Sequence, residues 1–288
     1  MTRKTSLLPA AILAPAALAV LAAAVMFGNA RRGRPIAGEL AEKPPTQRLP
    51  DEQQAGWSRV VAALQQVAEE HPEALELEQT ELIPPRLQQL GALLDETALL
   101  VARLGGSSAP EIGERLASIR RRVVGADYTL SDDCRALAAR IFESKPLLRS
   151  PVHKPDLARG KRVFAESCAA CHGKTGSGGS ALAATMNPPP ADVLHPQYNW
   201  TPYDMFNRVT YGGVETAMPS FEQGLSAAER WDVVFYLFAE RWPACKQPLP
   251  PLGADELALL GDFELSNRFP YGAAACLRRE YLAPREPR

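Results

Sequence analysis

The segment Cys168–His172 (CAACH) places two thiols and an imidazole within one short stretch of chain. Three chemistries use such a cluster: a redox dithiol, a zinc site and the covalent attachment of haem. A redox dithiol usually lies at a strand-to-helix junction, whereas a helical pattern precedes this pair. Structural zinc usually needs two close pairs of ligands, and the remaining cysteines are scattered singly, at Cys134, Cys245 and Cys276. The spacing therefore favours haem attachment, with an incidental disulfide loop as the alternative.

Haem attachment gives each of these residues a role. Cys168 and Cys171 would form thioethers with the two vinyl groups, and His172 would coordinate the iron from one face. The iron then needs a ligand on its opposite face, delivered from a distant loop. Met218 lies 46 residues after His172, in ETAMPSF, between a Gly-Gly turn and a proline that keeps the backbone extended. We therefore expect one covalently attached haem c, with His172 and Met218 as axial ligands.

Three other residues compete with Met218 for the second axial position. Met205 lies at a helical position in TPYDMFNRV, where a methionine most often fills the core. Met186 follows His172 by only 14 residues, and His195 is the other histidine of this segment. We expect Met205 to be buried and Met218 to be the ligand.

Helices must position these residues along the chain. The first is expected to start at Asp156 and to carry LARGKRVFAESC directly into the cysteine pair. After a glycine- and proline-rich loop, Thr201 caps a short helix with Pro202 in its first turn. Ser226-x-x-Glu229 is a capping box that opens the last helix of the segment. In the tail, we expect short helices around residues 255–263 and 273–281.

Residues 51–150 precede this segment and read as a helical bundle. Further helices are expected at residues 85–104, 110–124 and 131–144. The first helix should stop near His71-Pro72, because proline lacks the donor that continues a helix. Its apolar residues recur at helical spacing and predict a buried stripe: Trp57, Val60, Val61, Leu64 and Val67. The expected fold class is therefore all-α.

The sequence of the N-terminus predicts export. Arg3 and Lys4 precede an uncharged apolar run from Leu7 to Phe27, which reaches the roughly 20 residues that span a bilayer. We interpret residues 1–30 as either a cleaved signal peptide or an uncleaved inner-membrane anchor. Residues 31–50 are polar and proline-rich and read as a linker. Both interpretations place the remaining chain in the periplasm.

Residues 155–242 resemble a class I cytochrome c domain. The resemblance rests on the helix with Gly160 and Phe164, the CAACHG site, the proline-bearing loop, AMPSF and the aromatic at Tyr236. It implies that the first and last helices cross with Gly160 packed against Phe235 or Tyr236.

The same family resemblance implies a partner for the proximal histidine. A carbonyl of the proline loop accepts the Nδ1–H of that histidine and fixes the ring. Pro188, Pro189 or Pro190 would supply it here.

A broader resemblance covers about residues 51–285. The order of its parts is similar to that of the exported N-terminal region of bacterial oxidative iron permease fusions. These parts are the bundle, the lone cysteine, PDLARGKRVFAESCAACHGKTG, NPPPADV, GGVETAMPSF and AERWDVVFYLF. AAACLRREYLAP, in the C-terminal extension 243–288, fits the same similarity. Residues 1–288 contain no apolar spans after this region that would match the permease part. The resemblance implies an iron permease or ferroxidase system as a context, and it does not carry permease activity over.

These features predict an electron carrier rather than an enzyme. Two axial ligands leave no open site on the iron, and methionine ligation favours Fe(II) over Fe(III). The formal charge of −1 gives no basic surface for nucleic acid, so we expect redox partner proteins. The alternative is a haem-bearing sensor or a scaffold subunit of a respiratory or dehydrogenase complex. We expect the pocket lining to come from this set: Phe164, Leu182, Met205, Phe206, Tyr211, Phe221 and Tyr236.

Two further groups of residues carry weaker signals. An acidic cluster near the end of the first helix consists of His71, Glu73, Glu76, Glu78 and Glu81. These side chains could bind iron, but a solvated helix end explains the cluster better. For the tail, we prefer a disulfide between Cys245 and Cys276 that clamps it to the preceding domain. Pairing of Cys134 with either of them is the alternative.

Overall fold

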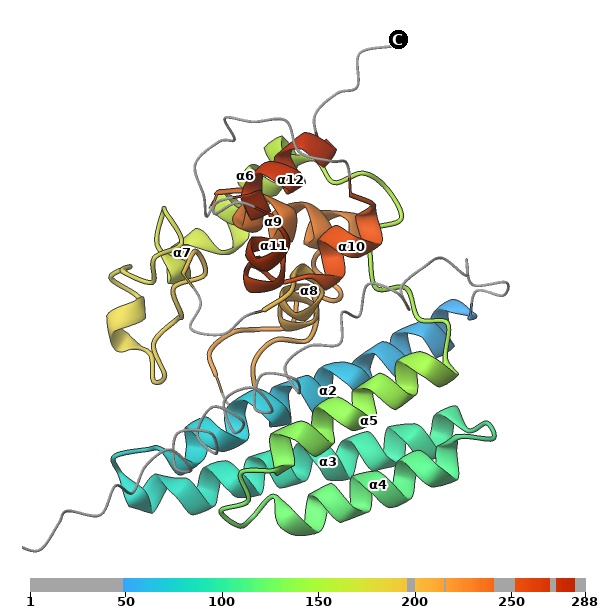
Figure 1. Ribbon diagram of the computed structural model, residues 1–288. Helices are drawn as coiled ribbons and strands as arrows, with labels where there is room; N and C mark the ends of the chain where they lie inside the picture. Colours follow the sequence, from blue (N-terminus) through green and yellow to red (C-terminus); the bar gives the residue numbers. More distant parts are fainter. Residues whose placement is uncertain (1–48, 196–199, 215, 241–251, 270–272, 283–288) are drawn as a thin grey trace, which may run out of the picture. The chain divides into compact units, whose positions relative to one another are not determined.

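The computed structural model describes residues 49–195, 200–214, 216–240, 252–269 and 273–282. The described part is helical and contains no strand, as expected for the all-α class (Figure 1). The apolar run at 7–27, most of the linker and Cys245 lie outside the described residues. Within the described residues, no helix combines the length and apolar character that crossing a membrane requires.

Four long helices form an antiparallel bundle in which consecutive helices are joined by short connections (Figure 1). Helix α2 packs on α3 and α5, and α4 packs on α3 and α5. The predicted stripe of α2 is buried, with Trp57 only 1% exposed. The helices are α2 (Asp51–Leu75), α3 (Ile83–Leu104) after the 3-10 turn η2 (Thr80–Leu82), α4 (Ala109–Arg122) and α5 (Leu130–Ser144).

The expected end of α2 at His71-Pro72 is wrong, because the helix runs through Pro72 to Leu75. A proline inside a helix leaves the carbonyl four residues earlier without its usual donor. Here that carbonyl belongs to Ala68, and the Ser131 hydroxyl of α5 donates to it at 2.7 Å. The neighbouring helix thus replaces the missing hydrogen bond and lets α2 continue for one more turn.

A second group of helices follows and packs around α9 (Ala227–Glu240). Helix α6 (Leu157–Ser167) crosses α9, α8 (Pro202–Tyr211) packs beside it, and α12 (Ala273–Leu282) lies on it. The remaining elements are α7 (Ala169–His172), η3 (Ala183–Thr185), α10 (Ala254–Leu259) and α11 (Asp262–Arg268). The single helix expected at 255–263 is wrong, since α10 ends at Leu259 and α11 starts at Asp262.

The two groups share one continuous hydrophobic core. The Phe142 ring of α5 meets the Tyr203 ring of α8 edge-on, with the centroids 5.9 Å apart. Helix α8 also packs along α2. Residues Gln47–Arg288 accordingly form one compact unit. The division into domains at 51–150, 155–242 and 243–288 stays a prediction.

Candidate functional site

Helix α6 begins and ends where the sequence predicts. The Asp156 carboxylate accepts hydrogen bonds from the backbone N–H groups of Ala158 and Arg159, at 2.9 and 3.1 Å, and so caps the helix. Asp156 N–H in turn donates to the Asp232 carboxylate of α9 at 2.8 Å. The start of α6 is therefore fixed to α9, and its last residue directly precedes Cys168.

Gly160 is the point of closest approach between α6 and α9. A Cβ atom there would lie 2.2 Å from the carbonyl oxygen of Asp232 and 2.9 Å from Cβ of Tyr236. This confirms the expected contact of Gly160 with an aromatic residue of the last helix, and selects Tyr236. The Phe164 ring lies one turn further along α6, 6.0 Å from the Tyr236 ring. The crossing therefore fixes where the C-terminal end of α6, and with it the cysteine pair, lies relative to α9.

The two thiols lie in a single helical turn. The backbone N–H groups of Cys171 and His172 both donate to the Cys168 carbonyl, at 3.1 and 3.0 Å. Both thiols are free and half-buried, and burial raises the pKa of Cys168 to about 11. Within the described residues, no group of three or more His, Cys, Asp or Glu side chains could by itself hold a metal ion.

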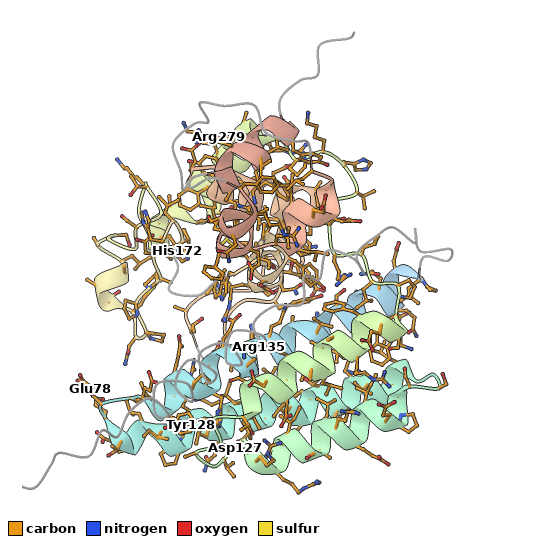
Figure 2. The ribbon with its side chains drawn as sticks, viewed as in Figure 1. Glu78, Asp127, Tyr128, Arg135, His172 and Arg279 are labelled. Atoms are coloured by element: carbon orange, nitrogen blue, oxygen red, sulfur yellow. The ribbon has the colours of Figure 1, made fainter. Side chains whose placement is uncertain are left out.

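His172, which Figure 2 labels, is oriented by a backbone carbonyl. Its Nδ1 lies 3.0 Å from the carbonyl oxygen of Ala191. Because a carbonyl only accepts, Nδ1 must carry the proton in this contact, which leaves Nε2 of the neutral ring as a free lone pair. The expected acceptor in Pro188–Pro190 is wrong by one residue, since the carbonyl belongs to Ala191, directly after the proline run.

Glycines in the chain segment that faces the proline run explain this one-residue difference. Gly176 accepts a hydrogen bond from Val193 N–H at 2.9 Å, so residues 176–178 and 190–193 run beside each other. Gly178 has φ 80° and packs so closely that a Cβ would lie 2.8 Å from the Pro190 carbonyl oxygen. The Pro190 carbonyl is therefore packed against Gly178, and the Ala191 carbonyl faces His172.

Met218 has its backbone fixed on both sides. Its N–H donates to the Thr216 hydroxyl at 3.2 Å, and its carbonyl accepts from Gly213 N–H at 3.3 Å. Gly212 has φ 78°, and a Cβ there would lie 2.7 Å from the Met218 carbonyl oxygen. The side chain is half-buried and packs against the hydrophobic core. No hydrogen bond to its sulfur is found among the described residues.

The competing residues lie in different surroundings. Met205 is 2% exposed, which confirms that it fills the core. Met186 is half-buried in the loop after η3. His195 is exposed, and its Nδ1 contacts the Asp192 carboxylate at 3.2 Å. Leu182, which we expected in the pocket lining, is 45% exposed.

Several of the other expected lining residues contact protein. The Phe206 ring stacks on Trp231 with the centroids 4.2 Å apart. The Tyr211 hydroxyl donates to the Ala55 carbonyl of α2 at 3.4 Å. Phe221 is half-buried and packs against the core. Their part in a pocket stays a prediction.

The acidic cluster at the end of α2 does not form a metal site among the described residues. His71 is 1% exposed, its Nε2 lies 3.1 Å from the Gly125 carbonyl oxygen, and burial lowers its pKa. Burial also raises the pKa of Glu73. His71 therefore serves the bundle core.

The cysteines outside the motif separate into two kinds. Cys134 is free and buried in the bundle, and burial raises its pKa to about 12. Pairing of Cys134 with a tail cysteine is therefore wrong. Cys276 is disulfide-bonded. Its pairing with Cys245 stays a prediction, because Cys245 lies outside the described residues.

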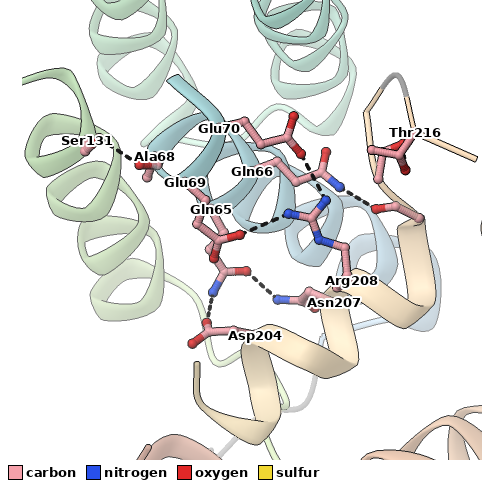
Figure 3. A network of polar contacts seen from close by, with 12 residues as sticks. Gln65, Gln66, Ala68, Glu69, Glu70, Ser131, Asp204, Asn207, Arg208 and Thr216 are labelled. Carbon is pink, nitrogen blue, oxygen red and sulfur yellow. Dashed lines mark hydrogen bonds and ion pairs between the residues drawn. The ribbon is translucent and has the colours of Figure 1, made fainter. Parts of the chain in front are cut away.

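Sequence reasoning missed a polar contact between the bundle and α8. Figure 3 shows its members from α2 (Gln65, Gln66, Glu69 and Glu70) and from α8 (Asp204, Asn207 and Arg208). Arg86 of α3 joins it through a hydrogen bond to Glu70. We call it the α2–α8 network. In the sequence its α2 members look like an ordinary solvated helix face, and no motif marks them.

Comparison with protein families identifies the segment that contains the thiols. Residues 155–237 match the family described as cytochrome c oxidase, cbb3-type, subunit III. The chain therefore contains a class I c-type cytochrome domain, which implies covalently bound haem c and suggests electron transfer. The match extends over less than a third of the chain. This match does not show the resemblance to iron permease fusions.

Two individual proteins are similar to parts of the chain. A thiosulfate dehydrogenase of Thiomonas intermedia (strain K12) is 29% identical over 103 residues, which is 34% of this chain and 31% of that protein. The chain thus spans about a third of the length of this relative. A reducing HAO-like protein complex of Kuenenia stuttgartiensis is 24% identical with a TM-score of 0.30, over 41% of this chain and 62% of that chain.

Proposed function

We propose that the protein transfers single electrons through one haem c held by Cys168, Cys171, His172 and Met218. The observation that carries this proposal is the contact from His172 Nδ1 to the Ala191 carbonyl at 3.0 Å. It leaves Nε2 as the coordinating atom and fixes the ring plane, which is the arrangement that an iron-ligating histidine requires. The matched cytochrome c domain supports the same reading.

The remaining residues fit the prosthetic group. Cys168 and Cys171 are free thiols within one helical turn, so both can form a thioether to the same ring. Met218 offers an unprotonated thioether sulfur on a loop whose backbone is hydrogen-bonded at both its N–H and its carbonyl. This donor set of one imidazole and one thioether suits a redox-active haem iron.

The chain's own residues then set the conditions for electron transfer. When bound, the haem supplies an iron that changes between Fe(III) and Fe(II). His172 and Met218 would hold the iron between them, which would leave no coordination site for a substrate. The Ala191 carbonyl holds the His172 ring, and the hydrogen bonds of Thr216 and Gly213 hold the Met218 backbone. Fixed ligands keep the reorganisation between the two oxidation states small.

We place this carrier outside the cytoplasm, in the periplasm, because of the apolar run at residues 7–27. Its redox partner is a protein of a respiratory or dehydrogenase system, in line with the oxidase-subunit family and the dehydrogenase that are similar to it. An iron-uptake partner stays a prediction from the sequence resemblance alone, without support from these comparisons.

A spectroscopic comparison of methionine variants tests the axial ligand. Met218→Ala should abolish the weak far-red charge-transfer band of the oxidised protein and lower the reduction potential, because the thioether is lost. Met186→Ala, which removes the other loop methionine, should keep the band and is the matched control. A Met218→Ala protein with an unchanged spectrum would rule out Met218 as the ligand.

The same proteins separate a carrier from a haem-bearing sensor. Carbon monoxide should bind slowly to the reduced wild-type protein, since Met218 must first leave the iron, and rapidly to Met218→Ala. Rapid binding to the wild type would point to an open coordination site and a sensing role.

A further inference from the structure

The α2–α8 network connects the bundle to the segment that carries Met218 (Figure 3). The Gln65 side chain bridges two α8 residues: its Nε2 donates to the Asp204 carboxylate, and its Oε1 accepts from Asn207 Nδ2 at 2.7 Å. Glu69 and Glu70, one turn further along α2, reach Arg208. The contacts thus follow α8 toward its C-terminal end, where the Met218 loop begins.

Charge complementarity fixes the position of α8 along α2. Arg208, with its side chain 14% exposed, donates to Glu70 at 2.9 Å and to Glu69 at 3.0 Å. Arg86 of α3 donates to the second oxygen of Glu70 at 2.7 Å. Buried charges that lose their partners are strongly destabilising. A displacement of α8 by one turn would break these pairs, so the network allows one register.

Two members of the network reach past α8 and hold the loop itself. Gln66 Nε2 donates to the Gly212 carbonyl at 2.5 Å, and Arg86 Nη1 donates to the Val214 carbonyl at 3.0 Å. Gly212 is the residue that packs directly against the Met218 carbonyl. The bundle therefore holds one side of Gly212, and the backbone of Met218 lies against its other side.

We infer that Gln66 and Arg86 are positioning residues for Met218, and that the bundle serves to hold the thioether on the iron. This inference rests on the proposed role of Met218 as axial ligand. An iron–thioether bond is weak enough to be displaced by added ligands, so its persistence depends on how firmly the loop is held. Gln66 and Arg86 oppose that displacement without contacting the iron.

Imidazole binding to the oxidised full-length protein tests the inference. Imidazole competes with Met218 for the iron, and its affinity is measured by the loss of the far-red band. Gln66→Met keeps the size of the side chain and removes its donor, and we expect it to raise the imidazole affinity about fivefold, as one lost hydrogen bond would. Arg86→Lys is the milder second variant. It keeps the charge beside Glu70, cannot reach both Glu70 and Val214, and should raise the affinity in the same direction.

Ser131→Ala provides the matched control. It also removes a buried hydrogen bond to α2, but on the side that faces α5. Its imidazole affinity should equal that of the wild type even though its melting temperature falls. If Gln66→Met and Arg86→Lys gave the imidazole affinity of Ser131→Ala, the inference would be wrong.

The experiment also separates this inference from the proposed function. Absence of the far-red band in the wild type, or its survival in Met218→Ala, overturns the assignment of Met218 and the inference with it. A band that depends on Met218 but responds equally to all three bundle variants overturns the inference alone.

Discussion

The bundle and the segment 168–195 differ in how they use apolar side chains. In the bundle, residues such as Leu64 and Leu90 are 0% exposed and are covered entirely by neighbouring helices. In residues 168–195, only Gly176 and Ala183 are buried, although Leu182, Val193 and other apolar residues are present. The bundle buries its apolar side chains against other protein side chains, whereas residues 168–195 are shaped by glycines, prolines and backbone hydrogen bonds. The second kind of architecture suits a segment that wraps a rigid prosthetic group.

A pair of leucine truncations should show this difference most strongly. Leu90→Ala in α3 should lower the free energy of unfolding by about 4 kcal/mol, because it leaves a cavity in a closed core. Leu182→Ala should cost less than about 1 kcal/mol, because the side chain is already 45% exposed. Urea unfolding of the haem-loaded protein measures both values. Equal losses would break the comparison, since they would mean that Leu182 becomes buried once the haem is attached.

The pH dependence of stability should sharpen the comparison at the contact between the bundle and α8. Burial raises the pKa of Glu69 from 4.5 to about 7. The folded protein thus binds this proton more tightly than the unfolded chain does. The stability that the protonated Glu69 contributes is therefore fully present below pH 4.5 and is lost as the pH rises through 7. The shift corresponds to at most about 3 kcal/mol.

Removal of the titrating group gives the measurement. The side chain of Glu69→Gln cannot titrate, so this variant should show a smaller decrease in the free energy of unfolding between pH 4.5 and 7.5 than the wild type. Urea unfolding at several pH values measures this decrease. Glu111→Gln, which removes an exposed carboxylate paired with Arg115 and Arg140, is the control and should keep the wild-type slope. If the free energy of unfolding of Glu69→Gln fell with pH as steeply as that of the wild type, the raised pKa of Glu69 would be contradicted.

Two glycines in helices give the smallest and most local test. Gly160→Ala should cost about 2 kcal/mol, because the new Cβ would lie 2.2 Å from the backbone oxygen of Asp232, which cannot yield easily. Gly113→Ala in α4 meets nothing within 4 Å and should be stabilising by roughly 0.5–1 kcal/mol. Thermal unfolding compares the two. A neutral Gly160→Ala would mean that α6 and α9 can separate without loss.

Local signals in the sequence were sufficient for the helix starts of the cytochrome segment. Asp156 caps α6, and Ser226 and Glu229 form the expected capping box, with Ser226 N–H donating to Glu229 at 2.9 Å. Thr201 caps α8 as expected, and the structure adds Asp204 as its partner in a capping box. Caps are predictable because each needs only residues that are two or three positions apart.

Long-range contacts decided what local signals could not. Pro72 indicates a helix end, yet Ser131, 59 residues away, supplies the donor that lets α2 continue. The acceptor for His172 depends on how Gly178 packs against Pro190, which shifts the contact to Ala191. Neither effect can be read from the neighbouring sequence.

The sequence by itself determined the chemistry: two thiols and a histidine at fixed spacing, a methionine between glycines and a proline, and helices with their caps. These depend on residue type and short separations. Only the tertiary structure decided that the bundle contacts the Met218 loop, because Gln66 and Gly212 lie 146 residues apart. A glutamine on a polar helix face looks alike in the sequence whether it faces solvent or holds a distant carbonyl.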